Sequence, residues 1–179
     1  MKEEIKLRQE TEKDFQEVEK LIESAFKDWS EDQEHLLVQR LRQSPSFIPE
    51  LSIVAEANGE IAGHILLTKV MIKNEKSESE SLTLAPVSVK PSWQNQGVGG
   101  KLILESHRQA KALNYKSIIV LGHENYYPKF GYQLCKKYGI KLPFDAPDEN
   151  CLVIELLENG LEGVRGIVQY DPAFFEKTE

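Results

Sequence analysis

The feature that most constrains this chain is a strand-like segment that runs through a glycine-rich turn into a helical pattern. Leu82–Val89 is apolar and strand-like. Gly97–Leu113 has three glycines among its first four residues and then repeats apolar residues at helical spacing. A second local signal is Asn58-Gly59, which predicts a hairpin because both residues tolerate positive φ. Hairpins combined with one strand–helix–strand crossover predict an α+β domain with a mixed sheet.

The remaining patterns place further elements along the chain. Thr11, followed by Asp14, predicts a helix start, and apolar residues recur at helical spacing from Phe15 to Phe26. Pro86 lies inside the strand before the glycines and predicts an edge, a bulge or a break there, because proline lacks the N–H donor. The other predicted elements are strands at Ile5–Arg8, Leu51–Ala57, Ile61–Ile72, Ser117–Leu121, Gln133–Lys136, Cys151–Leu157 and Val164–Gln169, a helix at Leu36–Leu41, and one or two helical turns at Tyr126–Phe130.

Composition excludes several classes of protein. Lys and Arg total 22 against 29 Asp and Glu, and a formal net charge of −7 is a poor fit to nucleic-acid binding. The two cysteines, Cys135 and Cys151, are too few for a disulfide framework and are expected to be reduced thiols in a cytoplasmic protein. No apolar run approaches the ~18 residues of a membrane span, so no membrane partner is expected. With no repeat or linker, we expect one domain over 1–179, with its core in 3–140 and C-terminal strands in 141–179.

The glycine-rich turn before the helix predicts an anion site. Successive backbone N–H groups and the positive end of the helix dipole both favour a phosphate, and glycine removes side chains that would keep it away. Two familiar phosphate loops are excluded by spacing. Asn95 stands where a P-loop needs its first glycine, and Leu102 holds the third glycine position of the dinucleotide pattern. The plain alternative is a turn that merely starts a helix.

The pattern Gln94-x-x-Gly97-x-Gly99 resembles that of the GNAT superfamily of acyl-CoA-dependent N-acyltransferases. Those enzymes carry Arg/Gln-x-x-Gly-x-Gly/Ala between a bulged fourth strand and the helix that holds the coenzyme A pyrophosphate. Leu84–Pro91 looks like that fourth strand with its exit proline, and Gly122–Tyr132 resembles the family's Tyr-x-x-x-Gly-Phe/Tyr element. The chain is most similar to predicted N-acetyltransferases with a Tyr-Tyr-x-x-Phe-Gly-Phe element and a tail like Pro143–Glu149. It departs from many members at Val120, where they place an Asn that contacts pantetheine.

The resemblance implies the GNAT fold: a mixed, mostly antiparallel central sheet with helices on both faces and a splayed fourth and fifth strand pair. It implies transfer of an acetyl group from acetyl-CoA to a primary amine by direct attack. The cosubstrate-binding residues that it implies are Val87, Ser88 and Val89 for the pantetheine arm and Gln94, Asn95, Gln96, Gly97, Val98, Gly99, Gly100 and Lys101 for the pyrophosphate.

The catalytic residues implied by the resemblance are Tyr127 and His123. A phenol, with a reference pKa of about 10, is protonated at neutral pH and can donate a proton to the departing thiolate. Tyr127 holds the family's tyrosine position, with Tyr126 as the fallback donor. His123 follows a predicted strand near where the family's active site opens, although a surface or packing role is its alternative. His64 and Glu23 are weaker candidates for the base.

The sequence also suggests which acceptor, which protein partner and which metals to expect. Acidic and aromatic groups between the first two helices can attract a cationic small-molecule or peptide amine, or form a solvated acidic loop. An exposed strand in the C-terminal third can pair between chains in a homodimer. No metal site is expected, because metal-ligand spacings are missing from the sequence. A non-catalytic acyl-CoA-binding sensor is the alternative function. The acceptor-region residues are Phe26, Asp28, Trp29, Glu31, Asp32 and Glu34.

Overall fold

The first two helices and the strands beside them form one part of the molecule. The computed structural model describes residues 3–27 and 33–176. Its backbone contacts define two compact units: the first unit is Met1–Leu67 with Ala85–Gln109, and the second unit is Thr68–Leu84 with Ala110–Glu179. Three elements run through both units, namely β3 (Glu60–Lys73), β4 (Glu78–Val89) and α3 (Val98–Ala112).

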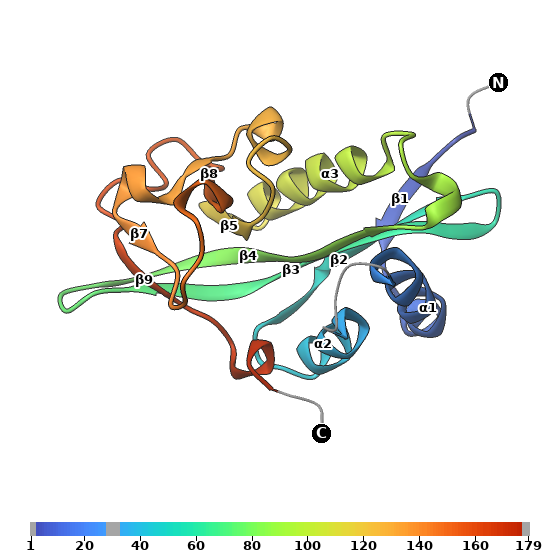
Figure 1. Ribbon diagram of the computed structural model, residues 1–179, viewed down its shortest axis with the longest axis horizontal. Helices are drawn as coiled ribbons and strands as arrows, with labels where there is room; N and C mark the ends of the chain where they lie inside the picture. Colours follow the sequence, from blue (N-terminus) through green and yellow to red (C-terminus); the bar gives the residue numbers. More distant parts are fainter. Residues whose placement is uncertain (1–2, 28–32, 177–179) are drawn as a thin grey trace. The chain divides into compact units, whose positions relative to one another are not determined.

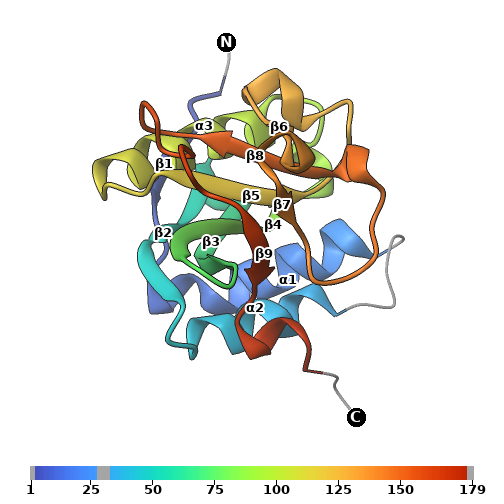
Figure 2. The ribbon, with the colours of Figure 1, turned by 90° about the vertical axis from the view of Figure 1, so that its left-hand side faces the viewer.

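In the first unit, β1 (Lys6–Gln9) pairs antiparallel with β2 (Phe47–Ala57). The helices α1 (Phe15–Phe26) and α2 (Glu34–Arg42) lie on one face of these strands and α3 on the other (Figures 1 and 2). The predicted capping pair is confirmed, since the Asp14 carboxylate accepts the Thr11 N–H at 2.8 Å just before α1. One face of α1 then buries its apolar residues, as the 3.6-residue period requires.

In the second unit, β8 (Cys151–Glu155) pairs antiparallel with both β5 (Ser117–Leu121) and β6 (Gln133–Leu134). The strand β9 (Gly166–Gln169) pairs antiparallel with β3 and parallel with β7 (Ile140–Lys141). Figure 2 shows β9 beside β3, with which it pairs. Over the described residues the strand order is β1-β2-β3-β4-β5-β8-β6, which confirms the predicted mixed, mostly antiparallel sheet.

The fourth and fifth strands part soon after they meet. Their parallel pairing places Leu82 opposite Ile118 and Thr83 opposite Ile119. Within the described residues this ladder ends there, although β5 continues to Leu121 and β4 to Val89. Pro86 lies in the part of β4 beyond its ladder with β5, so its missing N–H interrupts no hydrogen bond of that ladder. The sequence predicted an irregularity at Pro86. In the structure the pairing of β4 with β5 ends before Pro86, while the strand itself continues to Val89.

The strand predicted at Gln133–Lys136 is wrong in its second half. Only Gln133–Leu134 is extended, and Cys135–Tyr138 forms a 3₁₀ turn. Gly139 closes that turn with φ +70°, and its N–H is donated to the carbonyl groups of the turn. The backbone then resumes as β7, which the sequence patterns did not reveal. Over the described residues, no helix is long and apolar enough to cross a membrane.

A buried polar network joins β2, β3, α2 and Glu10, the residue after β1, within the first unit. Arg42 donates from Nη2 to Glu10 Oε2 at 2.8 Å and from Nε to Oε1 at 3.1 Å, with side-chain exposures of 6% and 1%. Ser52 Oγ donates to the same Glu10 carboxylate at 3.1 Å and lies 3.0 Å from Nε2 of His64. Burial lowers the pKa of His64 to about 4, so the ring is neutral at pH 7. His64 is therefore enclosed in a structural network, which removes it as a candidate base.

The His64 environment predicts acid-sensitive stability. The folded-state pKa of about 4 lies below the ordinary 6.5, so the unfolded chain binds a proton more readily. The resulting stabilisation is complete above pH 6.5 and is lost as the pH falls toward 4, by about 3 kcal/mol in total. We expect His64→Gln, which does not titrate in this range, to show a flatter unfolding free energy between pH 6.5 and 4.5. Urea unfolding of both proteins tests this, and parallel pH profiles would contradict it.

Candidate functional site

The predicted site residues fall into two groups, each within one unit. Residues 87–101 lie in the first unit, and Tyr127 and His123 lie in the second. In the first group, β4 is followed by the 3₁₀ turn Pro91–Trp93, the exposed turn 94–97 and then α3. The structure confirms the strand, glycine turn and helix that the sequence predicts here.

The turn presents backbone donors at the start of α3. Asn95 has φ +63° and Gly97 has φ +82°, so the chain reverses through two left-handed residues before the helix. Lys101 N–H donates to Gly97 O at 3.1 Å, which is the i to i−4 bond that closes the first turn of α3. The N–H groups at the start of a helix have no acceptor within that helix, and those before Lys101 occupy these positions in α3. Together with the helix dipole they suit an anionic group.

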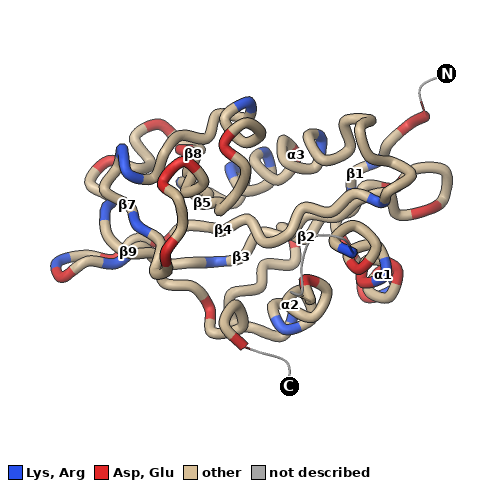
Figure 3. Tube along the Cα trace, viewed as in Figure 1, with Lys and Arg blue, Asp and Glu red and all other residues tan. Residues whose placement is uncertain are grey.

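Two side chains of the turn form hydrogen bonds with nearby backbone carbonyl groups. Gln94 donates from Nε2 to Val89 O at 3.1 Å, and Gln96 donates from Nε2 to Ser92 O at 3.1 Å. Lys101 is exposed in the first turn of α3, a helix that carries several basic residues (Figure 3). Both glutamine side chains are thus bonded to backbone carbonyl groups at or beside the turn.

The end of β4 lies against β3 and beneath α3. Val87 and Val89 are half-buried, and Ser88 is buried with an Oγ that has no hydrogen-bond partner among the described residues. At Gly63 on β3, an added Cβ would lie 2.9 Å from Val98 and Leu102 side chains of α3. Glycine at this position is therefore what allows the first turns of α3 to approach the strand. The sequence signal was a glycine inside a strand pattern, and it was missed.

In the second unit, Tyr127 begins the predicted helical turn, a 3₁₀ turn spanning Tyr127–Phe130. Its side chain is buried and meets Tyr126 and Tyr132 edge-on, with ring centroids 5.2 and 5.5 Å away. Burial raises the pKa of Tyr127 well above its ordinary value of 10, so the phenol keeps its proton at neutral pH. The Tyr127 phenol is therefore in its protonated form at neutral pH, and burial raises the pKa of Tyr126 as well.

The loop after β5 is shaped around the Tyr127 ring. A Cβ added at Gly122 would lie 2.2 Å from Cε2 of Tyr127, closer than side chains pack. The Gly122 N–H donates to Asn150 O at 2.9 Å, and Asn150 Nδ2 donates back to Gly122 O at 3.1 Å and to Glu124 Oε2 at 2.8 Å. Gly122 and Asn150 therefore fix the backbone against which Tyr127 packs.

His123 is exposed, and its ring takes part in the local turn. Its Nδ1 accepts the Asn125 N–H at 3.1 Å, so the neutral ring in this arrangement carries its proton on Nε2. His123 can accept a second proton at Nδ1 only by releasing Asn125. Glu23, the other weak candidate, is 57% exposed and lies 3.2 Å from Nε2 of His35.

Both cysteines are held in their thiol form. Cys135 is buried, and burial raises its pKa to about 12. Burial also raises the pKa of the half-buried Cys151. Both groups are thiols at neutral pH, and a thiolate is the reactive form. Across residues 3–27 and 33–176, no group of three or more His, Cys, Asp and Glu side chains is arranged to hold a metal ion.

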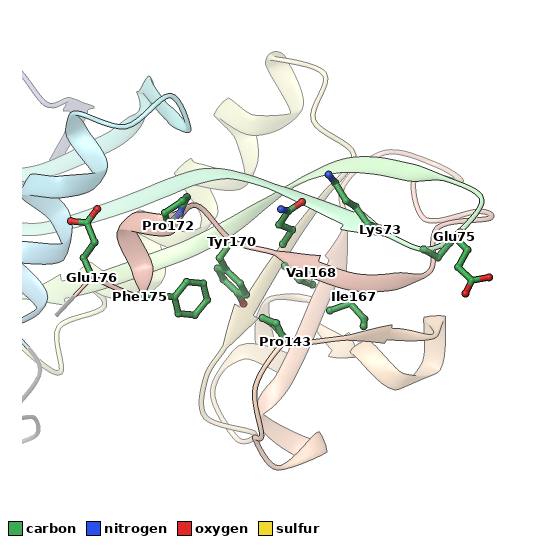
Figure 4. A pocket seen from close by; sticks show the side chains of 11 residues that line it. Lys73, Glu75, Pro143, Ile167, Val168, Tyr170, Pro172, Phe175 and Glu176 are labelled. Atoms are coloured by element: carbon green, nitrogen blue, oxygen red, sulfur yellow. The ribbon is translucent and has the colours of Figure 1, made fainter.

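An open groove of about 940 Å³ runs along β9 in the second unit (Figure 4). Ile167, Tyr170 and Phe175 give it an apolar wall, and two of these side chains are more than half exposed. Tyr170 packs edge-on against Phe174 at 5.1 Å, and burial raises its pKa to about 12. The residues that line this groove are separate from every residue that the sequence assigned to the site.

Comparisons with known proteins agree with the fold and the turn. A family model for the acetyltransferase (GNAT) domain matches residues 49–134, which include β4, the turn and α3. The uncharacterized N-acetyltransferase YjhQ of Escherichia coli K12 is 36% identical over 115 residues, which are 64% of this chain and 64% of YjhQ. The match thus spans just under two thirds of that relative.

Two solved structures share the fold over nearly the whole chain. The E. coli GNAT family N-acetyltransferase YhbS, in complex with CoA, has a TM-score of 0.88 and 22% identity, and the alignment covers 98% of this chain and 94% of YhbS. A GNAT family acetyltransferase from Brucella melitensis, in complex with acetyl-CoA, has a TM-score of 0.78 and 29% identity, over 96% of this chain and 98% of that one. Residues 49–134 thus match the acetyltransferase (GNAT) domain, and the chain shares its fold with these two GNAT family structures.

Proposed function

We propose that this protein transfers an acetyl group from acetyl-CoA to a primary amine. The observation that carries the proposal is the turn between β4 and α3, where Asn95 and Gly97 take left-handed backbone conformations in an exposed loop that leads directly into the N-terminus of α3. The N–H groups of that N-terminus fit a pyrophosphate, which is anionic and accepts several hydrogen bonds at once. The relatives from E. coli and B. melitensis were crystallised with CoA and acetyl-CoA, which supports the same choice of cosubstrate.

In this proposal the pantetheine arm and the pyrophosphate of acetyl-CoA are bound by two different parts of the segment 87–101. The backbone of Val87, Ser88 and Val89 hydrogen-bonds the pantetheine arm, as an added strand does in β-augmentation. Residues 94–101 bind the pyrophosphate through main-chain N–H groups, with Lys101 adding positive charge at the helix start. The end of the β4–β5 ladder at Thr83 supports this assignment, because β4 beyond that point has backbone groups not used by β5.

The transfer is proposed to be direct. The amine nitrogen attacks the thioester carbon, the new C–N bond forms, the C–S bond breaks, and the thiolate leaves with the electron pair. Tyr127 donates its phenolic proton to that thiolate and regains one from solvent. The amine loses its own proton to a base, for which His123 is the candidate, after it releases the Asn125 N–H. The raised pKa values of both cysteines support a route without an acyl-cysteine.

The acceptor is proposed to be a small-molecule or peptide amine. Of the residues expected to attract it, Phe26 and Glu34 are half-buried at the end of α1 and the start of α2. Asp28, Trp29, Glu31 and Asp32 lie outside the described residues. An acidic and aromatic surround favours a cationic amine over a neutral or anionic acceptor.

A Gly99→Val substitution is expected to weaken acetyl-CoA binding by about tenfold, which corresponds to ~1.4 kcal/mol. The added side chain crowds the N–H groups that the pyrophosphate needs, while valine and glycine have similar helix propensity. Gly99→Ala adds one methyl group and serves as the matched variant, with a smaller loss. Calorimetric titration gives the dissociation constants, and unchanged affinity in Gly99→Val would count against an anion site at this turn.

Thiol release in the presence of acetyl-CoA and a panel of primary amines tests the proposed activity. We expect one or more cationic amines to accelerate release above the rate with acetyl-CoA alone, with the acetylated amine as the product. Tight acetyl-CoA binding without accelerated release by any amine would instead favour the non-catalytic acyl-CoA sensor.

A further inference from the structure

Glu60, the first residue of β3, connects that strand to the approach of the glycine-rich turn. Its Oε1 accepts the indole Nε1–H of Trp93 at 2.8 Å, and its Oε2 accepts from Nζ of Lys90. Each carboxylate oxygen therefore has one donor, and both donors come from the four residues that precede the turn. The site residues named so far do not include Glu60.

The backbone around Glu60 is held on two sides. The next residue, Ile61, donates its N–H to Oε1 of Glu17 on α1 at 2.9 Å. Ala62 O accepts the Lys90 N–H at 2.8 Å, which ties β3 to the end of β4. The hydrogen bonds from Lys90 and then from Trp93 lower the pKa of Glu60, so the group is a carboxylate at neutral pH. Glu60 is thus an anchored, ionised acceptor.

Trp93 connects Glu60 to the glycine-rich turn. Its side chain is buried, with 7% exposure, although the turn residues that follow it are exposed. Its own N–H donates to Lys90 O at 2.7 Å and closes the 3₁₀ turn immediately before Gln94. The side-chain bonds of Gln94 and Gln96 join the turn to Val89 and Ser92, its sequence neighbours. The Glu60–Trp93 bond instead ties the turn to a different strand.

We propose that Glu60 is a positioning residue for cosubstrate binding, which acts through Trp93 to hold the pyrophosphate turn in its binding conformation. This inference rests on the proposed function. Several N–H groups bind one anion well only when they are already aimed at the same point, because ordering them on binding reduces affinity. Loss of the Glu60 anchor therefore weakens binding of the pyrophosphate without touching the part of the site that holds pantetheine.

Two acyl donors separate positioning from general stability. Acetyl-CoA carries the pyrophosphate, and S-acetyl-pantetheine carries the same thioester and arm without it. We expect Glu60→Ala and Trp93→Phe, which both remove the bond from the indole N–H, to raise the dissociation constant for acetyl-CoA by about three- to tenfold, the usual effect of losing such a hydrogen bond. The dissociation constant for S-acetyl-pantetheine, measured by chemical-shift titration, stays unchanged. Glu60→Gln keeps an oxygen for the indole N–H and retains most of the affinity for acetyl-CoA.

Glu78→Ala is the matched control. Glu78 on β4 lies 3.3 Å from Lys73 on β3, so it forms a carboxylate–lysine pair between the same two strands without a link to the turn. We expect its dissociation constants to equal those of the wild type. Equal weakening of both donors in Glu60→Ala, or unchanged acetyl-CoA binding in Glu60→Ala and Trp93→Phe, would overturn the positioning role alone. Failure of the wild type to bind acetyl-CoA would remove the proposed function and this inference together.

Discussion

Tyr127→Phe is expected to lower kcat by about a hundredfold or more and to change acetyl-CoA affinity by less than about twofold. The substitution removes the hydroxyl that would protonate the leaving thiolate and keeps the ring that packs against Tyr126 and Tyr132. Because burial keeps the phenol protonated at neutral pH, the wild-type group is in its donating form throughout that range. Steady-state thiol release with the accepted amine, together with calorimetry, measures the two quantities separately.

Tyr126→Phe is the matched control, since Tyr126 is the neighbouring phenol and the fallback donor. We expect it to keep turnover near that of the wild type. Gly122→Ala should reproduce the loss of turnover with the hydroxyl intact, because its Cβ would lie 2.2 Å from the Tyr127 ring and force the ring to move. A larger loss in Tyr126→Phe would transfer the role to Tyr126. Equal loss of turnover and affinity in Tyr127→Phe would make Tyr127 a structural or cosubstrate-contact residue.

Arg42→Met is expected to reduce the free energy of unfolding by about 3–5 kcal/mol. Arg42 is the cation of the buried network, where it neutralises Glu10, pairs with Glu19 at 3.2 Å and lies 4.0 Å from the centroid of the Phe15 ring. Methionine fills similar space and leaves Glu10 as a buried carboxylate without its guanidinium. The positive charge of Arg42 also helps to lower the pKa of His64, so the variant should protonate His64 at higher pH.

Arg8→Met provides a matched control with the same kind of ion pair in a more exposed place. Arg8 donates two hydrogen bonds to the Asp14 carboxylate, at 2.8 and 2.9 Å, but its side chain is 30% exposed. We expect this variant to lose about 1 kcal/mol, since solvent reaches the partly exposed Arg8 side chain and screens its pair. Urea unfolding at pH 7 compares the two variants. Similar losses of unfolding free energy in the two variants would contradict the claim that the buried network stabilises the fold more than the Arg8 pair does.

Local sequence signals predicted those parts of the fold that depend on neighbouring residues. The Thr11–Asp14 cap depends on side chains that few residue types carry, and the Asn58-Gly59 hairpin and the glycine turn before α3 each require a backbone conformation that few residue types adopt. Asn58 and Gly59 both have positive φ, as that hairpin requires. The two-residue strand β7 carries too short a pattern to be seen, and it exists because Gly139 redirects the chain toward β9.

Contacts between distant residues could not be predicted from a single sequence. Glu60 and Trp93 are separated by most of β3, the next hairpin and β4, so neither residue alone suggests their hydrogen bond. His64 was a candidate base because of its residue type, but burial beside Glu10 makes it structural. The assignments of residues 87–89, 94–101, Tyr127 and His123 remain predictions about ligand contacts, which only binding and kinetics can test.

Calorimetric titration of the purified protein with acetyl-CoA, with ATP and NAD as controls, tests most directly whether the turn at 94–101 binds an acyl-CoA. All three ligands carry phosphates, but only acetyl-CoA carries the pantetheine arm that the end of β4 is proposed to bind. We predict saturable binding of acetyl-CoA and much weaker binding of ATP and NAD. No binding of acetyl-CoA, or equal binding of acetyl-CoA and ATP, would contradict the proposed function.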